Sequence, residues 1–194
     1  MHATRRQIIN AATVTLLRTG YAGLSLRRIA DEAGVGVGHI HYHFRSKRNL
    51  VLAVLEDQNQ QRLARQREMF GSDEPLWKQW EQACDFLEDD LQSGYVRVLQ
   101  EMIAASWSDP EVAEHVRAFL RGWHELLTDV TRRAADRFGG LGPFAPDEIA
   151  ALAGDAFLGA EALMLLGLDD GQGIPHRAAL RRVGELIREH DLGG

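Results

Sequence analysis

A cluster of cationic, imidazole and phenolic side chains occupies a short stretch near the N-terminus, between residues 25 and 48. Guanidinium, ammonium, imidazole and hydroxyl groups donate hydrogen bonds to phosphate oxygens and to base edges, so this mixture suits contact with a nucleic acid. The members of the cluster are Arg27, Arg28, His39, His41, Tyr42, His43, Arg45, Lys47 and Arg48. The stretch therefore predicts a surface that binds a polyanion.

The distribution of charge along the chain supports the same prediction. The net charge is -6, but residues 1–67 hold 11 Lys and Arg against 4 Asp and Glu, a balance of +7. Residues 68–194 hold 11 against 24, a balance of -13. A basic end on an acidic chain indicates that this end meets the polyanion while the remainder is repelled by it.

The three histidines of the cluster raise the alternative of a metal site. His39 and His43 would share one face of a helix, but His41 points away from that face. Metal sites add carboxylate or thiolate ligands at a suitable spacing, and none joins these histidines. We therefore predict that the chain binds no metal.

An enzyme is the second alternative. A di-iron centre in a helical bundle needs Glu-x-x-His pairs, whereas Glu111 and His115 are four residues apart and have no second pair. We find neither a glycine-rich phosphate loop nor a nucleophile elbow. Cys84 is the only cysteine, lies among apolar neighbours and predicts a packing residue. We predict no catalytic residue and no cofactor.

The elements that must position the cluster are helices, since no run of alternating polar and apolar residues predicts a strand. Apolar spacing predicts helices at about 4–18, 26–33 and 37–43, and a long fourth helix, capped by Ser46, at about 46–70. Further helices are expected at about 76–91, 95–107, 110–138, 146–167 and 176–190. The predicted fold is all-α, with about nine helices.

The second and third helices are short and joined by Gly34-Val35-Gly36, which gives them the proportions of a helix-turn-helix motif. In such a motif one helix lies in the major groove of DNA and the other braces it. We expect a DNA-binding domain at residues 1–50 and a second domain at 51–194, connected by the long fourth helix.

The stretch from Gly20 to Leu55 resembles the DNA-binding domain of the TetR family of bacterial repressors. The residues that carry the resemblance are Gly20-Tyr21, Ser25, Ile29-Ala30, Ala33-Gly34-Val35, Gly38, Tyr42-His43-Phe44, Ser46-Lys47 and Leu50. The chain departs from the family pattern at Gly36-Val37, where Ser-Lys is common, and at His41, where Tyr is common. These departures predict an unusual base preference.

The resemblance implies roles for individual residues. Ser25 would cap the second helix and touch a phosphate, Gly38 would allow close approach to DNA, and Lys47 would anchor another phosphate. Val37 could pack on a thymine methyl group. The residues expected to contact DNA are Ser25, Arg27, Arg28, Val37, Gly38, His39, His41, Tyr42, His43 and Lys47.

The second domain is expected to bind a small-molecule effector, because its aromatic residues and methionines could enclose an apolar cavity. The resemblance points to the central helices as the lining of such a cavity. The expected pocket residues are Met102, Trp107, Phe119, Trp123, His124 and Phe157. Packing within the core is the alternative role for each of them, and a structural hydrogen bond is the alternative for His124.

Small and apolar residues surround the expected helix at 146–167 on nearly all sides, which predicts that it is buried at a two-fold interface together with the last helix. The residues expected in this dimer interface are Phe157, Leu158, Leu163, Leu166, Val183, Leu186 and Ile187. A dimer would also set two recognition helices ~34–36 Å apart, or at a multiple of that distance, on a palindromic operator.

These inferences predict a dimeric, sequence-specific repressor that a small apolar or aromatic effector releases from double-stranded operator DNA. The alternative is a DNA-binding activator or architectural protein without an effector. No apolar run approaches the ~20 residues needed to span a bilayer, and the N-terminus lacks the pattern of a signal peptide. We therefore expect no membrane partner and a cytoplasmic location.

Overall fold

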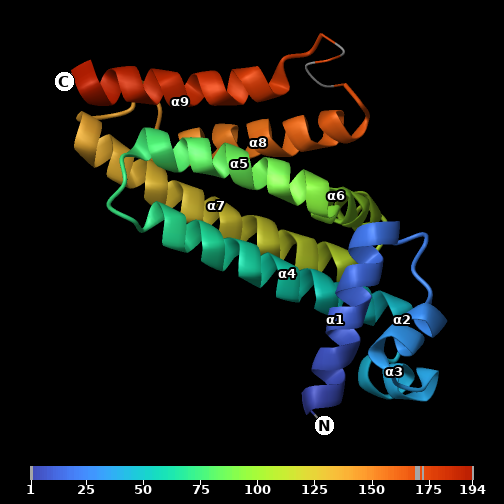
Figure 1. The fold of residues 1–194 in the computed structure, drawn as a ribbon. Helices are drawn as coiled ribbons and strands as arrows, with labels where there is room; N and C mark the ends of the chain where they lie inside the picture. Colours follow the sequence, from blue (N-terminus) through green and yellow to red (C-terminus); the bar gives the residue numbers. More distant parts are fainter. Residues whose placement is uncertain (1, 169–170, 172, 194) are drawn as a thin grey trace. The chain divides into compact units, whose positions relative to one another are not determined.

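The computed structural model describes residues 2–168, 171 and 173–193, and these contain nine helices and no strand. Figure 1 shows their order along the chain. The helices are α1 (His2–Thr19), α2 (Leu26–Ala33), α3 (Val37–Phe44), α4 (Lys47–Phe70), α5 (Leu76–Ser93), α6 (Tyr95–Ser106), α7 (Pro110–Phe138), α8 (Pro146–Leu165) and α9 (His176–Gly193). The predicted all-α fold is confirmed.

Local signals in the sequence account for most helix ends. The Ser46 hydroxyl accepts a hydrogen bond from the Asn49 amide at 3.1 Å, so the predicted cap of α4 is present. Pro110 and Pro146 are the first residues of α7 and α8. At this position proline costs no hydrogen bond, because the N–H group that it lacks would have no partner within the helix. α8 ends two residues earlier than expected because the chain turns at Gly167, whose φ is 75°.

Packing divides the chain into two compact units. The first unit holds residues up to Gln61 and the segment Gln92–Phe119, and the second holds Arg62–Leu91 and the chain from Leu120 onward. The divisions therefore fall within α4, α5 and α7, each of which contributes residues to both units. The functional domains expected at 1–50 and 51–194 stay a prediction.

In the first unit, the start of α6 holds the end of α1. Arg97 Nη2 donates to the Leu17 carbonyl oxygen at 2.6 Å, and the Tyr21 amide donates to the Glu101 carboxylate at 2.8 Å. Gly94 precedes α6 with a φ of 83°, and a Cβ there would overlap the Leu17 carbonyl oxygen. Glycine is therefore required both by conformation and by space.

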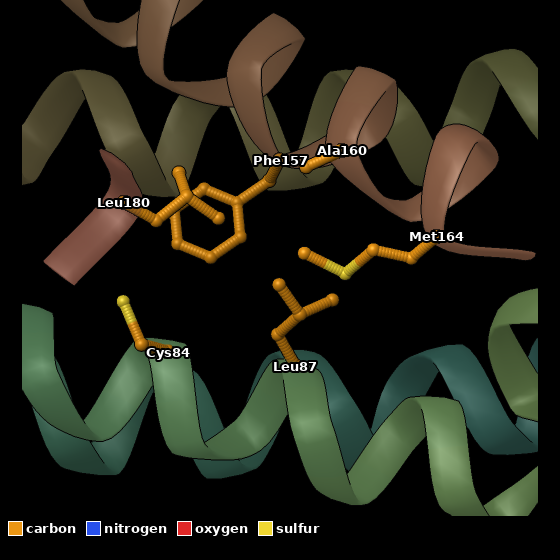
Figure 2. Close-up of a cluster of buried hydrophobic side chains, with 6 residues drawn as sticks. All are labelled: Cys84, Leu87, Phe157, Ala160, Met164 and Leu180. Carbon is orange, nitrogen blue, oxygen red and sulfur yellow. The ribbon is translucent and has the colours of Figure 1, made fainter. Parts of the chain in front are cut away.

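In the second unit, α5, α8 and α9 share a core cluster of Cys84, Leu87, Phe157, Ala160, Met164 and Leu180. Figure 2 shows these side chains converging from the three helices. Trp80 Nε1 donates to the Leu180 carbonyl oxygen at 2.7 Å, which ties α5 to α9. Burial raises the pKa of the Cys84 thiol to about 11, so this cysteine stays a neutral packing group at physiological pH.

None of the helices in the described part of the chain combines the length and apolarity that a membrane crossing requires.

Replacing Gly94 with alanine should lower the free energy of unfolding by about 3–5 kcal/mol, because positive φ and overlap with Leu17 act together. Gly139→Ala is the matched control, since Gly139 has a φ of 74° but a Cβ there would meet only open space. It should cost about 1–2 kcal/mol. Urea unfolding at one protein concentration measures both, and equal losses would contradict the proposed overlap.

Candidate nucleic-acid interface and ligand cavity

The turn between α2 and α3 is fixed by backbone hydrogen bonds. Gly34 takes the left-handed conformation, with φ 64° and ψ 31°, directly after α2. The Val35 amide donates to Ala30 at 2.9 Å and the Gly34 amide to Asp31 at 3.2 Å, which is the Schellman arrangement. Gly36 is extended, and α3 begins at the next residue. The sequence Gly-Val-Gly therefore sets the direction of α3.

α2 and α3 each have one buried and one exposed side. Ile29 and Ala30 of α2 and Ile40 and Phe44 of α3 are buried in the first unit. Of the residues expected to contact DNA, the exposed ones are Arg27, Arg28, Gly38, His39, His41 and Tyr42. Tyr42 is the most prominent large side chain on α3, with 70% of its surface exposed. The polar side of α3 is therefore available to a ligand.

Ser25, Val37, His43 and Lys47 are half-buried at the margin of this surface. Ser25 stands at the N-cap position of α2, but its hydroxyl makes no capping hydrogen bond, which corrects the expected capping role of its side chain. Its carbonyl oxygen accepts the first helical bond, from Ile29 at 3.1 Å. The ammonium of Lys47 lies 4.7 Å from the centre of the Tyr21 ring. This contact limits where the Lys47 charge can reach.

Arg48 differs from its neighbours because it is already paired with carboxylates. It donates to Asp109 at 2.8 Å and also pairs with Glu111. Asp109 caps α7, accepting the amides of Glu111 at 3.0 Å and Val112 at 3.3 Å. The Val112 amide and Arg48 hold the pKa of Asp109 below its usual value. Arg48 therefore ties the start of α4 to the start of α7 within the first unit.

Arg45, which links α3 to α4, has an unusual backbone conformation. Its φ is 62° and its ψ is -38°, and the Ser46 amide donates to the Phe44 carbonyl oxygen at 2.7 Å across it. This is a γ-turn of the rare kind, which is strained for any residue with a Cβ. The strained turn lies beside the exposed side of α3, and the Arg45 side chain is exposed.

The second unit contains an apolar cavity of about 480 Å³. Residues of α4, α5, α7, α8 and α9 line it. Its lining includes Phe70, Leu76, Trp80, Leu127, Val130, Thr131, Ala134, Phe138, Leu141, Ile149, Leu152, Ala153, Ala156, Leu180, Val183, Leu186, Ile187 and His190. Among these residues none carries a carboxylate or an amine. The cavity thus has the size and composition of a site for an apolar small molecule.

The pocket residues expected from the sequence do not line this cavity. Trp123 and Phe157 line a smaller cavity of about 50 Å³ in the same unit. Met102 is buried in the first unit, and 83% of Trp107 is exposed. Phe119 is half-buried in the first unit. His124 is half-buried, and its carbonyl oxygen accepts a bond from the Thr128 hydroxyl at 2.9 Å.

The physical reason is that short side chains at some positions of the wall leave space that larger side chains would fill. Ala134, Ala153 and Ala156 supply such positions. The many small residues of α8 were the one feature of the sequence that could have indicated the cavity. From composition alone, the same residues predicted a dimer interface.

The residues expected in the dimer interface occupy two environments. Leu166, Leu186 and Val183 have exposed fractions of 73%, 58% and 37%, while Leu158, Leu163 and Ile187 are half-buried. Phe157 is buried within the second unit, with its ring centre 5.5 Å from that of Trp80. The geometry therefore gives Phe157 a packing role inside the subunit.

A helix-turn-helix whose second helix exposes a polar face, with exposed arginines on the first, is the arrangement of a DNA-binding domain. Residues 8–54 match the family model of bacterial regulatory proteins of the tetR family. This match assigns residues 8–54 to the TetR type of DNA-binding domain, the resemblance that the sequence motif predicted.

Two curated relatives agree with this assignment. The chain is 26% identical to the HTH-type transcriptional regulator UidR of Escherichia coli over 140 residues, 69% of this chain and 65% of UidR. It is 40% identical to the HTH-type transcriptional regulator TtgR of Pseudomonas putida over 75 residues, 38% of this chain and 36% of TtgR. The matches thus span less than two thirds of these relatives.

The fold as a whole is similar to that of solved structures. A protein from Saccharomonospora viridis, crystallised in complex with choline, superposes with a TM-score of 0.75 at 20% identity. The superposition covers 98% of each chain. At this identity the likeness concerns the fold.

Replacing Arg45 with glycine should raise the free energy of unfolding by about 0.5–1 kcal/mol. Relief of the positive-φ strain, about 1–2 kcal/mol, exceeds the entropy that glycine loses on folding, about 0.5–1 kcal/mol. Arg45→Ala removes the same charge but keeps a Cβ, so it should change stability little. Urea unfolding of the two variants gives the comparison, and an equal gain for alanine would show that charge, not strain, is responsible.

Proposed function

We propose that this protein is a homodimeric transcriptional repressor that binds a palindromic operator through α2 and α3 and leaves it when a small apolar molecule enters the second unit. The observation that carries the proposal is the exposed polar side of α3, beside the exposed Arg27 and Arg28 of α2, in a domain that matches the TetR family model. Dimer formation, effector binding and the link between effector and DNA each have further support.

Direct contact with DNA is supported by the chemistry of the exposed side. His39, His41 and Tyr42 offer donors and acceptors for base edges, and Gly38 leaves open space where a Cβ would otherwise project. Arg27 and Arg28 of α2 are exposed cations suited to phosphates. Val37 takes the place of a polar residue and favours contact with a thymine methyl group.

Dimer formation is supported by an apolar face on α8 and α9. Leu152 of α8, Leu186 of α9 and Leu166, which directly follows α8, have exposed fractions of 54%, 58% and 73%. Gly159 lies on the exposed part of α8, and a Cβ there meets nothing within 4 Å. Apolar side chains interspersed with small residues allow two helices to approach closely, as a two-fold interface requires.

Effector binding is supported by the 480 Å³ cavity, whose lining is almost entirely apolar. The Thr131 hydroxyl donates to the Pro146 carbonyl oxygen at 2.6 Å, so its hydrogen is already engaged. The structural relative from Saccharomonospora viridis holds choline, a small molecule, which supports ligand binding by a protein of this fold.

The link between effector and DNA would pass along α4 and α7, which each contribute residues to both compact units. At the first-unit end, Arg48 joins these helices through Asp109 and Glu111. A ligand that favours one arrangement of the helices then changes DNA affinity by the coupling free energy, typically about 1–3 kcal/mol.

Binding is tested on DNA fragments selected from the host genome by the purified protein. Tyr42→Ala should weaken binding of the shared palindrome about tenfold, because an exposed contact on the recognition helix is removed. Trp107→Ala is the control, since it removes an aromatic side chain that is 83% exposed at the end of α6. Fluorescence anisotropy at fixed salt gives the affinities. Unchanged affinity of the Tyr42 variant would argue against this orientation of α3.

Gly159→Glu should convert the dimer into monomers, with the dimer dissociation constant raised about 100-fold by a charge buried without a partner. The subunit itself should stay folded, because a side chain at Gly159 has open space and glutamate favours helix over glycine by about 0.5–1 kcal/mol. Gln82→Glu adds the same charge on the exposed side of α5. Sedimentation velocity distinguishes the two, and a dimeric Gly159 variant would refute the α8 interface.

A further inference from the structure

The helix proposed to read the operator, α3, carries no permanent positive charge. Its sequence, Val37–Phe44, contains neither lysine nor arginine, and its basic groups are the imidazoles of His39, His41 and His43. DNA phosphates attract cations, which lysine and arginine supply at any pH near neutrality. An imidazole supplies a cation only after it takes up a proton, and histidine does so in the physiological range of pH. The charge of α3 therefore depends on protonation.

Two of the three imidazoles lie on the exposed side of the helix. His39 and His41 are exposed, and at about 3.6 residues per turn they stand on opposite sides of Tyr42, which is 70% exposed. His43 is half-buried, and its ring packs edge-on against the Tyr42 ring with 5.1 Å between the centres. His39 and His41 are therefore the imidazoles available to DNA.

The surroundings of α3 give these two imidazoles no carboxylate partner in the free protein. Within the part of the chain that the structure describes, neither His39 nor His41 forms an ion pair. His39 also stands in the first turn of α3, where the helix amides disfavour a cation. The charged residues on the elements around α3 are Arg5 and Arg6 of α1, Arg27, Arg28, Asp31 and Glu32 of α2, Arg45 of the linking turn, and Lys47 and Arg48 of α4.

We propose that operator binding is coupled to proton uptake at His39 and His41. Both ring nitrogens of a protonated imidazole donate hydrogen bonds, which suits phosphate oxygens and the N7 and O6 acceptors of guanine. Because the complex holds these protons more tightly than the free protein does, DNA affinity is greatest at low pH and decreases as the pH rises through neutrality. The inference rests on the proposed function, since it adds regulation by pH to the same DNA-binding surface.

The test measures binding of the full-length protein to the selected operator fragment at about pH 6 and about pH 8, at fixed salt, by fluorescence anisotropy. The affinity of the unsubstituted protein should fall about tenfold or more over this range. The double variant His39→Gln, His41→Gln should change less than about threefold, because glutamine keeps hydrogen-bonding groups but does not titrate. Circular dichroism at both pH values shows that each protein is folded.

His115→Gln is the matched control. It removes an exposed imidazole from α7, also in the first unit, and should keep the full pH dependence. Calorimetric titration in phosphate and in Tris, whose ionisation enthalpies differ, counts the protons taken up with the DNA. We expect uptake of about one proton or more by the unsubstituted protein near neutrality and close to none by the double variant. Equal pH dependence in the double variant and the unsubstituted protein would overturn the inference.

The same measurements separate this inference from the proposed function. If the unsubstituted protein binds the operator fragment equally well at both pH values, DNA binding stands and proton coupling fails. If no DNA fragment is bound at either pH, both fail.

Discussion

The close approach of α6 to the end of α1 is the constraint on which the DNA-binding part of the chain depends. The last carbonyl groups of a helix lack partners within it, and α6 supplies one through Arg97, which donates to Leu17 at 2.6 Å. Glu101 accepts the Tyr21 amide immediately beyond. Gly94 allows this approach because it has no Cβ. The orientation of α1, and of α2 and α3 packed with it, therefore follows from the position of α6 within the first unit.

A second attachment acts at the other end of the motif. Arg48 follows directly after the first residue of α4 and pairs with Asp109, the cap of α7. Both attachments join the DNA-binding helices to elements that come later in the sequence. They use charged or backbone groups with defined directions, so they fix orientation as well as distance. A shift of α6 or α7 must therefore either break these bonds or move α2 and α3.

The sequence predicted the helix-turn-helix closely because its signals are local. Gly34 and Gly36 specify the turn, Ser46 caps α4, and Ile40 and Phe44 give α3 its buried side. The cavity was not predictable in this way. Its lining comes from five helices, α4, α5, α7, α8 and α9, and from Leu141, and its volume depends on which of their side chains meet. Trp107 is a large aromatic residue of the type that often lines a pocket. In the structure, however, no neighbouring element covers it, and 83% of its surface is exposed.

Trp80 links two cavities of the second unit to α9. It lines both the cavity of about 480 Å³ and the smaller one of about 50 Å³, while its indole nitrogen donates to the Leu180 carbonyl oxygen of α9. On the other side of the contact, Gly184 leaves only enough room for the ring, since a Cβ there would lie 3.0 Å from Trp80 Cδ1. A ligand that displaces this ring must therefore weaken the hydrogen bond or move α9. Because α9 also carries the exposed Leu186, occupancy of the cavity and the surface proposed for dimer formation depend on the same helix.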